Sequence, residues 1–228
     1  MSHPADSTTL LLLLGAPGAG KGTQGRELAR RTGALHLSAG DLLRAEIAAG
    51  SELGAIAKVA IGRGELVPNM LTVAMIADRL ARPDVGGRVV LDGFPRNIAQ
   101  AEALDRLTDT LPYRLAPLLL VVDRARLERR LTGRSTCPAC GAIYHFEFHP
   151  SRVAGLCDED GATLAVRPDD QPAVIAARLR HQLGLLDALV DFYAADRRLI
   201  SVDGEGTIDE VARRMLRASR RAFQIVSD

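Results

Sequence analysis

The sequence predicts an α/β fold in which a five-stranded parallel sheet is flanked by helices. Short apolar runs, each bounded by Gly, Pro, Asp or charged residues, alternate along the chain with longer stretches of helical periodicity. Such alternation is typical of a parallel sheet covered by helices. The predicted strands are 10–14, 34–37, 88–91, 117–122 and 199–202, and the predicted helices are 22–31, 71–80, 98–107, 124–131, 173–193 and 208–222.

Two segments interrupt this alternation. Residues 38–67 contain two short helical patterns, 42–49 and 53–61, with no strand between them, which predicts a small helical insertion. Residues 133–167 contain all three cysteines, several glycines and prolines, and no helical pattern of useful length. A segment of about 35 residues cannot bury enough surface to be stable alone, so we expect something other than a core to hold it.

A glycine-rich run, residues 15–23 (GAPGAGKGT), follows the first predicted strand and opens the first predicted helix. Such a turn points backbone N–H groups inward, and the helix N-terminus and Lys21 add positive charge. We interpret the run as a P-loop that holds a nucleotide polyphosphate. Gly22 occupies the usual Ser or Thr position, and the hydroxyl arrives at Thr23. The alternative is a glycine-rich turn with a solvated lysine.

The composition narrows the class of protein. With 47% hydrophobic and 25% charged residues, the chain resembles an ordinary globular protein with a sizeable core. The formal net charge is only +1, so the chain lacks the basic field that is typical of nucleic-acid-binding proteins. We expect no nucleic-acid partner, and any anionic ligand must be met by local arginines.

The sequence also favours a cytoplasmic protein with no membrane partner. The five leucines of residues 10–14 are too few to span a bilayer, and the residues before them include Asp6 but no Lys or Arg, unlike a signal peptide. Three cysteines, an odd number, argue against a disulfide framework. The first eight or so residues lack periodicity and are expected to form a mobile extension.

The cysteines have the spacing of a zinc site. Cys137 and Cys140 form one knuckle of x2 spacing, and Cys157 begins a second knuckle in which Asp160 holds the fourth place. Tetrahedral zinc accepts thiolate, imidazole or carboxylate, and four protein ligands leave no open position, so the predicted site is structural. Metal binding would then supply the folding energy of the segment. Two alternatives remain: His145 or His149 as the fourth ligand, and free cysteines without metal.

Charged residues gather near the predicted nucleotide site. Asp92 and Arg96 lie just past a predicted strand, at the sheet edge where open α/β folds bind ligands. Asp92 is placed to meet Mg²⁺ directly or through water, and the alternative is a turn or cap aspartate.

Further arginines lie where the two insertions join the body, and each taken singly is more often a surface residue. Phosphoryl transfer needs arginines that neutralise the charge on the transferred group, and closing segments deliver them while excluding water. Asp169 and Asp170 are expected either to orient these guanidinium groups or to cap the helix that begins near residue 172. The arginines are Arg44, Arg130, Arg134, Arg167 and Arg178.

Taken together, these motifs resemble the adenylate kinase family in its long form with a zinc-bearing lid, and the resemblance spans nearly the whole chain. The family implies a P-loop core (residues 1–37, 68–129 and 168–228), a segment that binds the nucleoside monophosphate (38–67) and a lid (130–167). It also implies a monomer that transfers the terminal phosphoryl group of MgATP to AMP, giving two ADP. The motifs are residues 15–23, 38–41, 64–67 and 92–96, Gln100 and the two knuckles.

By position, the resemblance assigns residues to the two nucleotides. ATP would contact Gly18, Ala19, Gly20, Lys21, Gly22, Thr23, Arg130, Arg134, Ile143, Tyr144 and Gly206. AMP would contact Ala39, Arg44, Glu65, Leu66, Val67, Gly93, Phe94, Pro95, Arg96, Gln100, Arg167 and Arg178.

The resemblance also assigns catalytic roles. Because the acceptor phosphate is already anionic, no strong general base is needed, and the task is alignment and charge neutralisation. Asp41 and Asp92 would position hydrated Mg²⁺, and structural Zn²⁺ would keep the lid rigid as it closes. The catalytic residues would be Lys21, Asp92, Arg96, Arg134, Arg167 and Arg178.

Three positions depart from the family pattern. Ala39 stands where many relatives have Thr, so that only a backbone contact to the acceptor remains. Gly206 replaces a lysine whose main chain touches the donor adenine, and Glu65 replaces a residue that is often Lys or Arg, which is expected to weaken acceptor affinity slightly. None of the three removes a residue assigned to phosphoryl transfer.

Two other functions compete with this prediction. The first is a kinase for UMP, CMP or GMP, against which Gln100 argues because its amide can pair with the N1 and N6 edge of adenine. The second is a zinc-finger binding module that uses nucleotide as a switch and nucleic acid as partner. The near-neutral charge and the small number of basic and aromatic residues on one face argue against it.

Overall fold

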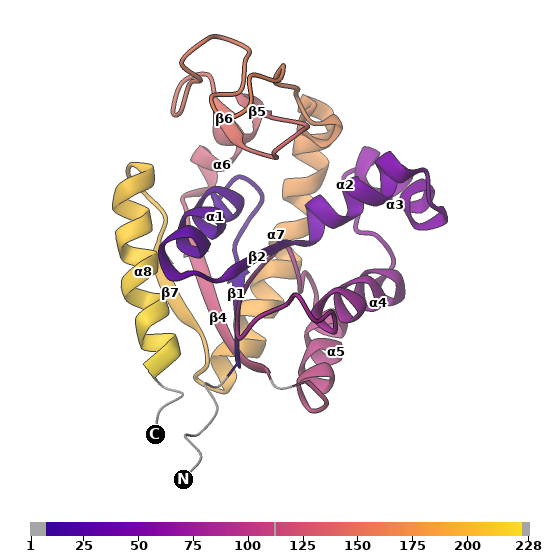
Figure 1. Ribbon diagram of the computed structural model, residues 1–228, viewed down its shortest axis with the longest axis vertical. Coiled ribbons are helices and arrows are strands. Elements are labelled where there is room, and N and C mark those ends of the chain that lie inside the picture. Colours follow the sequence, from indigo (N-terminus) through magenta and orange to yellow (C-terminus); the bar gives the residue numbers. More distant parts are fainter. Residues whose placement is uncertain (1–7, 112, 225–228) are drawn as a thin grey trace.

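The computed structural model describes residues 8–111 and 113–224, and it confirms the predicted five-stranded parallel sheet (Figure 1). The mobile extension expected for the first eight or so residues lies almost wholly outside the described residues. Thr8 is described and already belongs to the first strand. The strands are β1 (Thr8–Leu14), β2 (Leu35–Ser38), β3 (Arg88–Asp92), β4 (Tyr113–Val121) and β7 (Ile200–Asp203), in the order β2-β3-β1-β4-β7.

Strand β1 lies at the centre of the sheet and is buried on both faces. Its leucines alternate: Leu11 and Leu13 join one apolar cluster, and Leu10, Leu12 and Leu14 join the other. An unbroken run of leucines suits such a strand because both of its faces meet helices.

Strand β4 begins four residues before the predicted start, at Tyr113 rather than Pro117. Proline is normally excluded from central strands because it lacks an N–H for the ladder. Here Pro117 pairs with Leu12 of β1, while the pairing of β4 with β7 begins only at Leu118. The proline therefore lies beyond the end of β7, and the strand continues through it.

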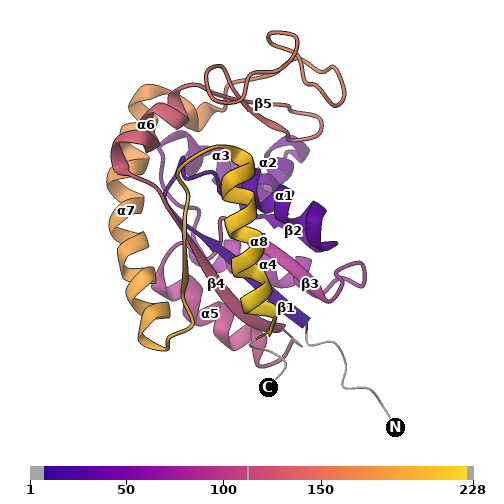
Figure 2. The same ribbon diagram turned by 90° about the vertical axis from the view of Figure 1, so that its left-hand side faces the viewer.

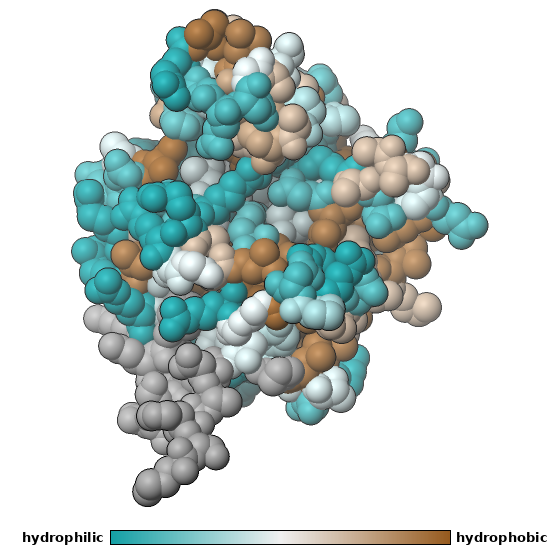
Figure 3. All heavy atoms as spheres, in the orientation of Figure 1, coloured by the Kyte–Doolittle hydropathy of each residue, from teal (hydrophilic) through white to brown (hydrophobic). Residues whose placement is uncertain are grey.

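Helices cover both faces of the sheet (Figure 2). Helices α1 and α8 pack against each other on the face of Leu11 and Leu13, and α4 and α5 pack on the opposite face. Hydrophilic side chains cover the outer side of α1 (Figure 3). The structure describes no helix that has both the length and the apolar character to cross a membrane. The helices of the core are α1 (Lys21–Thr32), α4 (Asn69–Leu80), α5 (Ile98–Thr108), α6 (Arg124–Thr132), α7 (Pro172–Ala195) and α8 (Ile208–Gln224).

Two smaller units stand beside the carboxyl ends of the strands (Figure 1). The helical segment, residues 38–67, contains α2 (Ala39–Ala49) and α3 (Glu52–Gly62). The segment predicted as a lid, residues 130–167, begins with the last residues of α6 and contains the antiparallel hairpin β5 (Arg134–Thr136) and β6 (Ile143–His145). The rest of the segment consists of turns and irregular structure. A single 3-10 turn, Pro168–Asp170, joins the lid to α7.

Candidate functional site

A cavity of about 720 Å³ opens between the P-loop, the helical segment and the lid. Nearly every residue that the sequence assigned to a nucleotide lines it. The predicted residues that line the cavity are Gly18, Ala19, Gly20, Lys21, Gly22, Thr23, Ala39, Asp41, Arg44, Glu65, Leu66, Val67, Asp92, Gly93, Arg96, Gln100, Arg130, Arg134, Ile143, Tyr144, Arg167, Arg178 and Gly206.

Two residues with predicted AMP contacts do not line the large cavity. Phe94 is fully buried in the apolar cluster that includes Leu12 of β1 and Leu91 of β3. Pro95 lines a separate cavity of about 60 Å³ behind the P-loop. The contacts of both residues with AMP stay predictions.

The P-loop has the conformation that its glycines allow. Gly15, Gly18 and Gly20 have φ values of 147°, 83° and 98°, a region that side chains with a Cβ rarely adopt. At Gly18 a Cβ would also come 2.7 Å from the carbonyl oxygen of Leu127. The loop can therefore wrap the N-terminus of α1 only with glycine at these positions, and the amides there form an anion-binding turn.

Lys21 lies at the floor of this turn. Its ammonium group donates hydrogen bonds to the carbonyl oxygens of Gly15 at 2.7 Å and Ala16 at 2.9 Å. Removal from bulk water lowers the pKa of Lys21 to about 8, with neighbouring arginines adding to the effect and Asp92 opposing it. An anion beside Lys21 would favour its charged form.

Gly22 permits a close approach of the lid to the loop. A Cβ at this position would come 3.0 Å from Cδ1 of Ile143 and 3.4 Å from a carboxylate oxygen of Asp92. The unusual glycine in the P-loop pattern therefore has a steric reason, since a Ser or Thr side chain would compete with Ile143 for the same space.

Arg130 connects the lid to the far end of the P-loop. Its guanidinium donates to the carbonyl oxygens of Ala19 at 3.4 Å and Gly204 at 3.2 Å. It therefore lies between the P-loop and the turn that holds Gly206. Gly206 has φ 110°, and a Cβ there would come 2.5 Å from Glu210.

A buried carboxylate holds two arginines from different parts of the chain. Asp170 has no exposed side-chain surface and accepts hydrogen bonds from Arg134 of β5 at 2.7 and 2.5 Å and from Arg178 of α7 at 3.2 Å. Arg178 also pairs with Asp169 at 2.8 Å. Helix α7 has no side-chain cap, so of the two predicted roles the aspartates orient guanidinium groups.

The remaining positive charge at the site is poorly compensated. Burial lowers the pKa of Arg96 and of Arg167, and arginine neighbours lower both further: Arg178 acts on Arg96, and Arg134 on Arg167. Nε of Arg167 is buried and has no hydrogen-bond partner among the described residues. Because arginine keeps its charge in proteins, a bound anion would relieve this surplus.

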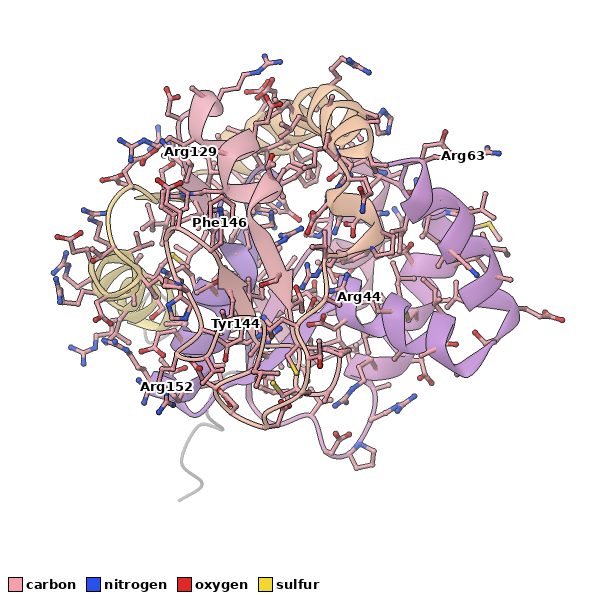
Figure 4. All side chains as sticks on the ribbon, turned by 90° about the horizontal axis from the view of Figure 1, so that it is seen from above. Arg44, Arg63, Arg129, Tyr144, Phe146 and Arg152 are labelled. Atoms are coloured by element: carbon pink, nitrogen blue, oxygen red, sulfur yellow. The ribbon has the colours of Figure 1, made fainter. Side chains whose placement is uncertain are left out.

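On the side of the helical segment, Arg44 pairs with Asp41 at 2.5 Å, and Arg26 of α1 reaches the same carboxylate at 3.5 Å. Burial raises the pKa of Asp41, and the greater effect of the two arginines leaves it lowered overall. Seen from above, Arg44 lies where the helical segment faces the lid (Figure 4). Asp92 ends β3 and is nearly buried, facing the P-loop across Gly22.

Sequence reasoning missed one arginine, Arg26, and two asparagines, Asn69 and Asn97. Arg26 also donates to the carbonyl oxygen of Cys140 at 3.4 Å, so that it contacts both the helical segment and the lid. Asn69 and Asn97 contact Gln100 through hydrogen bonds. Arg26 showed no signal beyond its position on the first helix, whereas Asn97 is a residue type that often precedes a helix.

The four residues of the predicted metal site come together in the lid. Their ligand atoms, one each from Cys137, Cys140, Cys157 and Asp160, all lie within 4.8 Å of one another. Three soft thiolates and one carboxylate suit zinc in a four-coordinate site. His145 is held instead by the backbone of Arg129, and His149 stacks on Tyr144 at 5.6 Å, so neither joins the cluster.

Comparison with known proteins gives one consistent result. The family model described as "Adenylate kinase" matches residues 13–198. A protein named adenylate kinase from Nitrosococcus oceani is 48% identical over 204 residues, which cover 89% of this chain and 94% of the relative. Proteins of the same name from Thermodesulfovibrio yellowstonii and Salinispora tropica are 46% and 44% identical, covering 88% and 92% of this chain and 94% and 97% of their own length.

Proposed function

Since the chain belongs to the adenylate kinase family, we propose that it transfers the terminal phosphoryl group of MgATP to AMP, giving two ADP, inside the 720 Å³ cavity. The observation that carries this assignment is the convergence of Lys21, Arg96, Arg134, Arg167 and Arg178 on one cavity that is bounded by a P-loop. A cavity with this surplus of buried positive charge suits two polyanionic nucleotides at once.

The donor nucleotide occupies the P-loop side. Amides of residues 18–23 and the Lys21 ammonium bind the β- and γ-phosphates of ATP. Asp92 and Asp41 would position the hydrated Mg²⁺ that accompanies ATP, since carboxylate oxygens suit a hard cation. Arg130 and Gly206 line the far end of the loop, which supports binding of the donor adenine between them. Ile143 and Tyr144 of the lid close over the donor.

The acceptor occupies the side of the helical segment. Arg44 and Arg96 bind the phosphate of AMP, with Arg167 and Arg178 between the two nucleotides. Backbone groups of residues 65–67 and the carboxamide of Gln100 line the end of the cavity where the adenine of AMP binds. Ala39 has no side-chain hydroxyl, so that this residue offers the acceptor only a backbone contact.

The chemical step is an in-line displacement. An oxygen of the AMP phosphate forms a bond to the γ-phosphorus, and the bond from that phosphorus to the β,γ-bridging oxygen breaks, so that ADP leaves carrying the electron pair. Lys21, Arg134, Arg167 and Arg178 neutralise the charge that spreads over the transferred oxygens. Asp170 accepts hydrogen bonds from both Arg134 and Arg178 and so holds the two side chains next to each other. Arg134 of the lid therefore reaches the reacting group together with Arg178 of the core.

Cys137, Cys140, Cys157 and Asp160 of the lid would hold a structural zinc ion, since their ligand atoms lie within 4.8 Å of one another. When bound, the ion fixes the two knuckles relative to each other and takes no part in the chemistry. The residues around it then present Arg134, Ile143 and Tyr144 to the cavity as one rigid surface.

ADP formation from ATP with AMP, GMP, CMP or UMP tests the assignment. We expect rapid turnover with AMP alone, and equal or faster turnover with UMP would assign another nucleoside monophosphate kinase. Lys21→Ala is expected to lose on the order of 3 kcal/mol or more of transition-state stabilisation. Lys58→Ala is the matched control, since Lys58 is an exposed lysine of α3 outside the cavity. Unchanged turnover of Lys21→Ala would remove Lys21 from the mechanism.

The zinc-finger alternative has its own test. It requires salt-dependent binding of DNA or RNA by a protein without kinase activity. The first knuckle instead contacts the core, since the carbonyl oxygen of Cys140 accepts a hydrogen bond from Arg26 of α1 at 3.4 Å. We expect that immobilised single- or double-stranded nucleic acid does not retain the protein in a salt-dependent way when nucleotide is present at a concentration that saturates its site.

A further inference from the structure

Three carboxamide side chains form a continuous hydrogen-bonded network at the acceptor end of the cavity. Gln100 of α5 is 2% exposed, and its Nε2 donates to Oδ1 of Asn69 at 3.0 Å. The same oxygen of Asn69 accepts from Nδ2 of Asn97 at 2.9 Å. Oε1 of Gln100 accepts from the backbone N–H of Arg96 at 2.7 Å.

The direction of every bond in this network is fixed by the backbone. The chain of bonds ends at two backbone N–H groups, which can only donate: Arg96 N–H to Gln100, and Gln100 N–H to Oδ1 of Asn97 at 3.0 Å. If any one amide were turned over, an NH₂ group would face an N–H, or two oxygens would face each other. The position of oxygen and nitrogen in Gln100 is therefore determined by chemistry.

One acceptor site and one donor site of Gln100 remain for a ligand. Its Oε1 has a second lone pair and its Nε2 a second hydrogen, and the residue lines the cavity. Adenine presents an amino donor at position 6 and an acceptor at N1, which complement this pair. A 6-oxopurine presents the reverse pattern, an acceptor at position 6 and a donor at N1, so that two like groups would meet at the amide.

We propose that Asn69 is a specificity-determining positioning residue, which holds the Gln100 amide in the orientation that selects a 6-aminopurine monophosphate over a 6-oxopurine one. This inference rests on the proposed function, because it concerns the acceptor of that reaction. Without the Oδ1 acceptor of Asn69, Nε2 of Gln100 loses its protein partner. The amide is then held only through Oε1 by the N–H of Arg96, and it can tilt about this remaining bond out of the plane of the base. If the Gln100 amide can turn, the site rejects a 6-oxopurine less strongly, because the like groups of the base and the amide are no longer forced together.

The position of Asn69 leaves little room for a merely structural role. It is the first residue of α4, whose N-cap is Pro68, and no side chain caps this helix. Replacing its side chain therefore removes no helix cap. Asn97, by contrast, caps α5 through its Oδ1. Asn69 can thus be changed without loss of a cap, and Asn97 cannot.

AMP and IMP are the matched pair of acceptors, because they differ only in the 6-position and the hydrogen at N1. We would measure kcat and KM for both with the full-length protein, its Asn69→Leu and Asn69→Asp variants and the control Met70→Ala. Met70 is the next residue of the same helix turn and is 84% exposed. Asn69→Asp keeps an oxygen that accepts from both Gln100 and Asn97.

In Asn69→Leu we expect the ratio of kcat/KM for AMP to that for IMP to fall about tenfold, mainly through a higher KM for AMP. In Asn69→Asp and Met70→Ala the ratio should stay within about threefold of the unaltered protein. An unchanged ratio in Asn69→Leu, or an equal fall in Met70→Ala, would overturn the inference. Absence of AMP turnover in the unaltered protein would instead overturn the proposed function, so the two failures are distinct.

Discussion

The helical segment and the lid flank the same cavity, yet different interactions stabilise them. In the helical segment, α2 and α3 pack around a small apolar cluster that includes Leu43, Ala57 and Ala60. The buried cluster of the lid consists of Cys137, Tyr144 and Cys157, two of which are predicted metal ligands. One segment is thus held by helix packing and the other by ligand atoms.

The difference shows two ways to build a small unit beside a parallel sheet. Two short helices can exclude water from a few alanines and leucines, whereas a hairpin with long turns buries too little apolar surface for this. Tyr144 of β6 also connects the hairpin of the lid to the second knuckle. Its hydroxyl lies 3.5 Å from the sulfur of Cys157 and accepts a hydrogen bond from the N–H of Asp158 at 2.8 Å. Removing the metal should therefore affect one segment and spare the other.

Metal removal is the largest expected effect. Chelation of the purified protein should unfold the lid, because zinc supplies on the order of 10 kcal/mol to the folding of such knuckles. Hydrogen exchange followed by mass spectrometry would locate the loss of protection in residues 133–167, with residues 38–67 unchanged. Cys140→Ser and Asp160→Ala should lower both metal content and melting temperature. If neither does, the structural-zinc assignment fails.

Asp170→Asn tests how the lid is tied to the core. The substitution leaves the buried guanidinium of Arg134 without its charged partner. Such a loss lowers the free energy of unfolding by about 3 to 5 kcal/mol. Denaturant unfolding at neutral pH would measure the cost. Asp84→Asn is the control, since its pair with Arg79 is on the surface and 64% of the Asp84 side chain is exposed. A loss no larger than the control would mean that Arg134 finds another partner.

Gly54→Ala tests the packing of the helical segment. A Cβ there would lie 2.1 Å from the carbonyl oxygen of Glu46, so α2 and α3 must separate, at about 1 to 3 kcal/mol. Gly62→Ala in the same helix meets nothing within 4 Å and should be neutral or stabilise by about 1 kcal/mol. We expect faster hydrogen exchange in residues 38–67 for Gly54→Ala alone, with unchanged zinc content. Loss of metal in that variant would mean that the two segments are not independent.

Arg26→Gln is expected to have the smallest effect. Arg26 contacts Asp41 of the helical segment and the Cys140 carbonyl of the lid, both at long distance, so its loss should cost no more than about 1 kcal/mol. Arg30→Gln is the control on the same helix, because Arg30 pairs only with Glu27 among the described residues. Calorimetric titration with AMP and with ATP would show whether Arg26 couples the two segments. Equal affinities in both variants would show that it does not.

The sequence allowed most of the fold and of the cavity to be predicted, for physical reasons that can be named. Leucine runs with turn residues at their ends determine strands, and the glycine spacing of residues 15–23 determines the loop. That the side chains of Phe94 and Pro95 do not line the cavity could not be predicted, because a motif gives positions along the chain and does not give the direction of a side chain. The Asn69 network escaped prediction because its members are 28 and 31 residues apart.

The arrangement of the sheet also bears on how the chain is made. Leu11 and Leu13 of β1 are synthesised before part of their cover, since Val202, Val211 and Met215 belong to β7 and α8, much later in the sequence. During synthesis that face of the sheet stays partly exposed until α8 leaves the ribosome. A chain stopped before α8 would therefore present an apolar surface on its central strands, and such surfaces attract chaperones or aggregate.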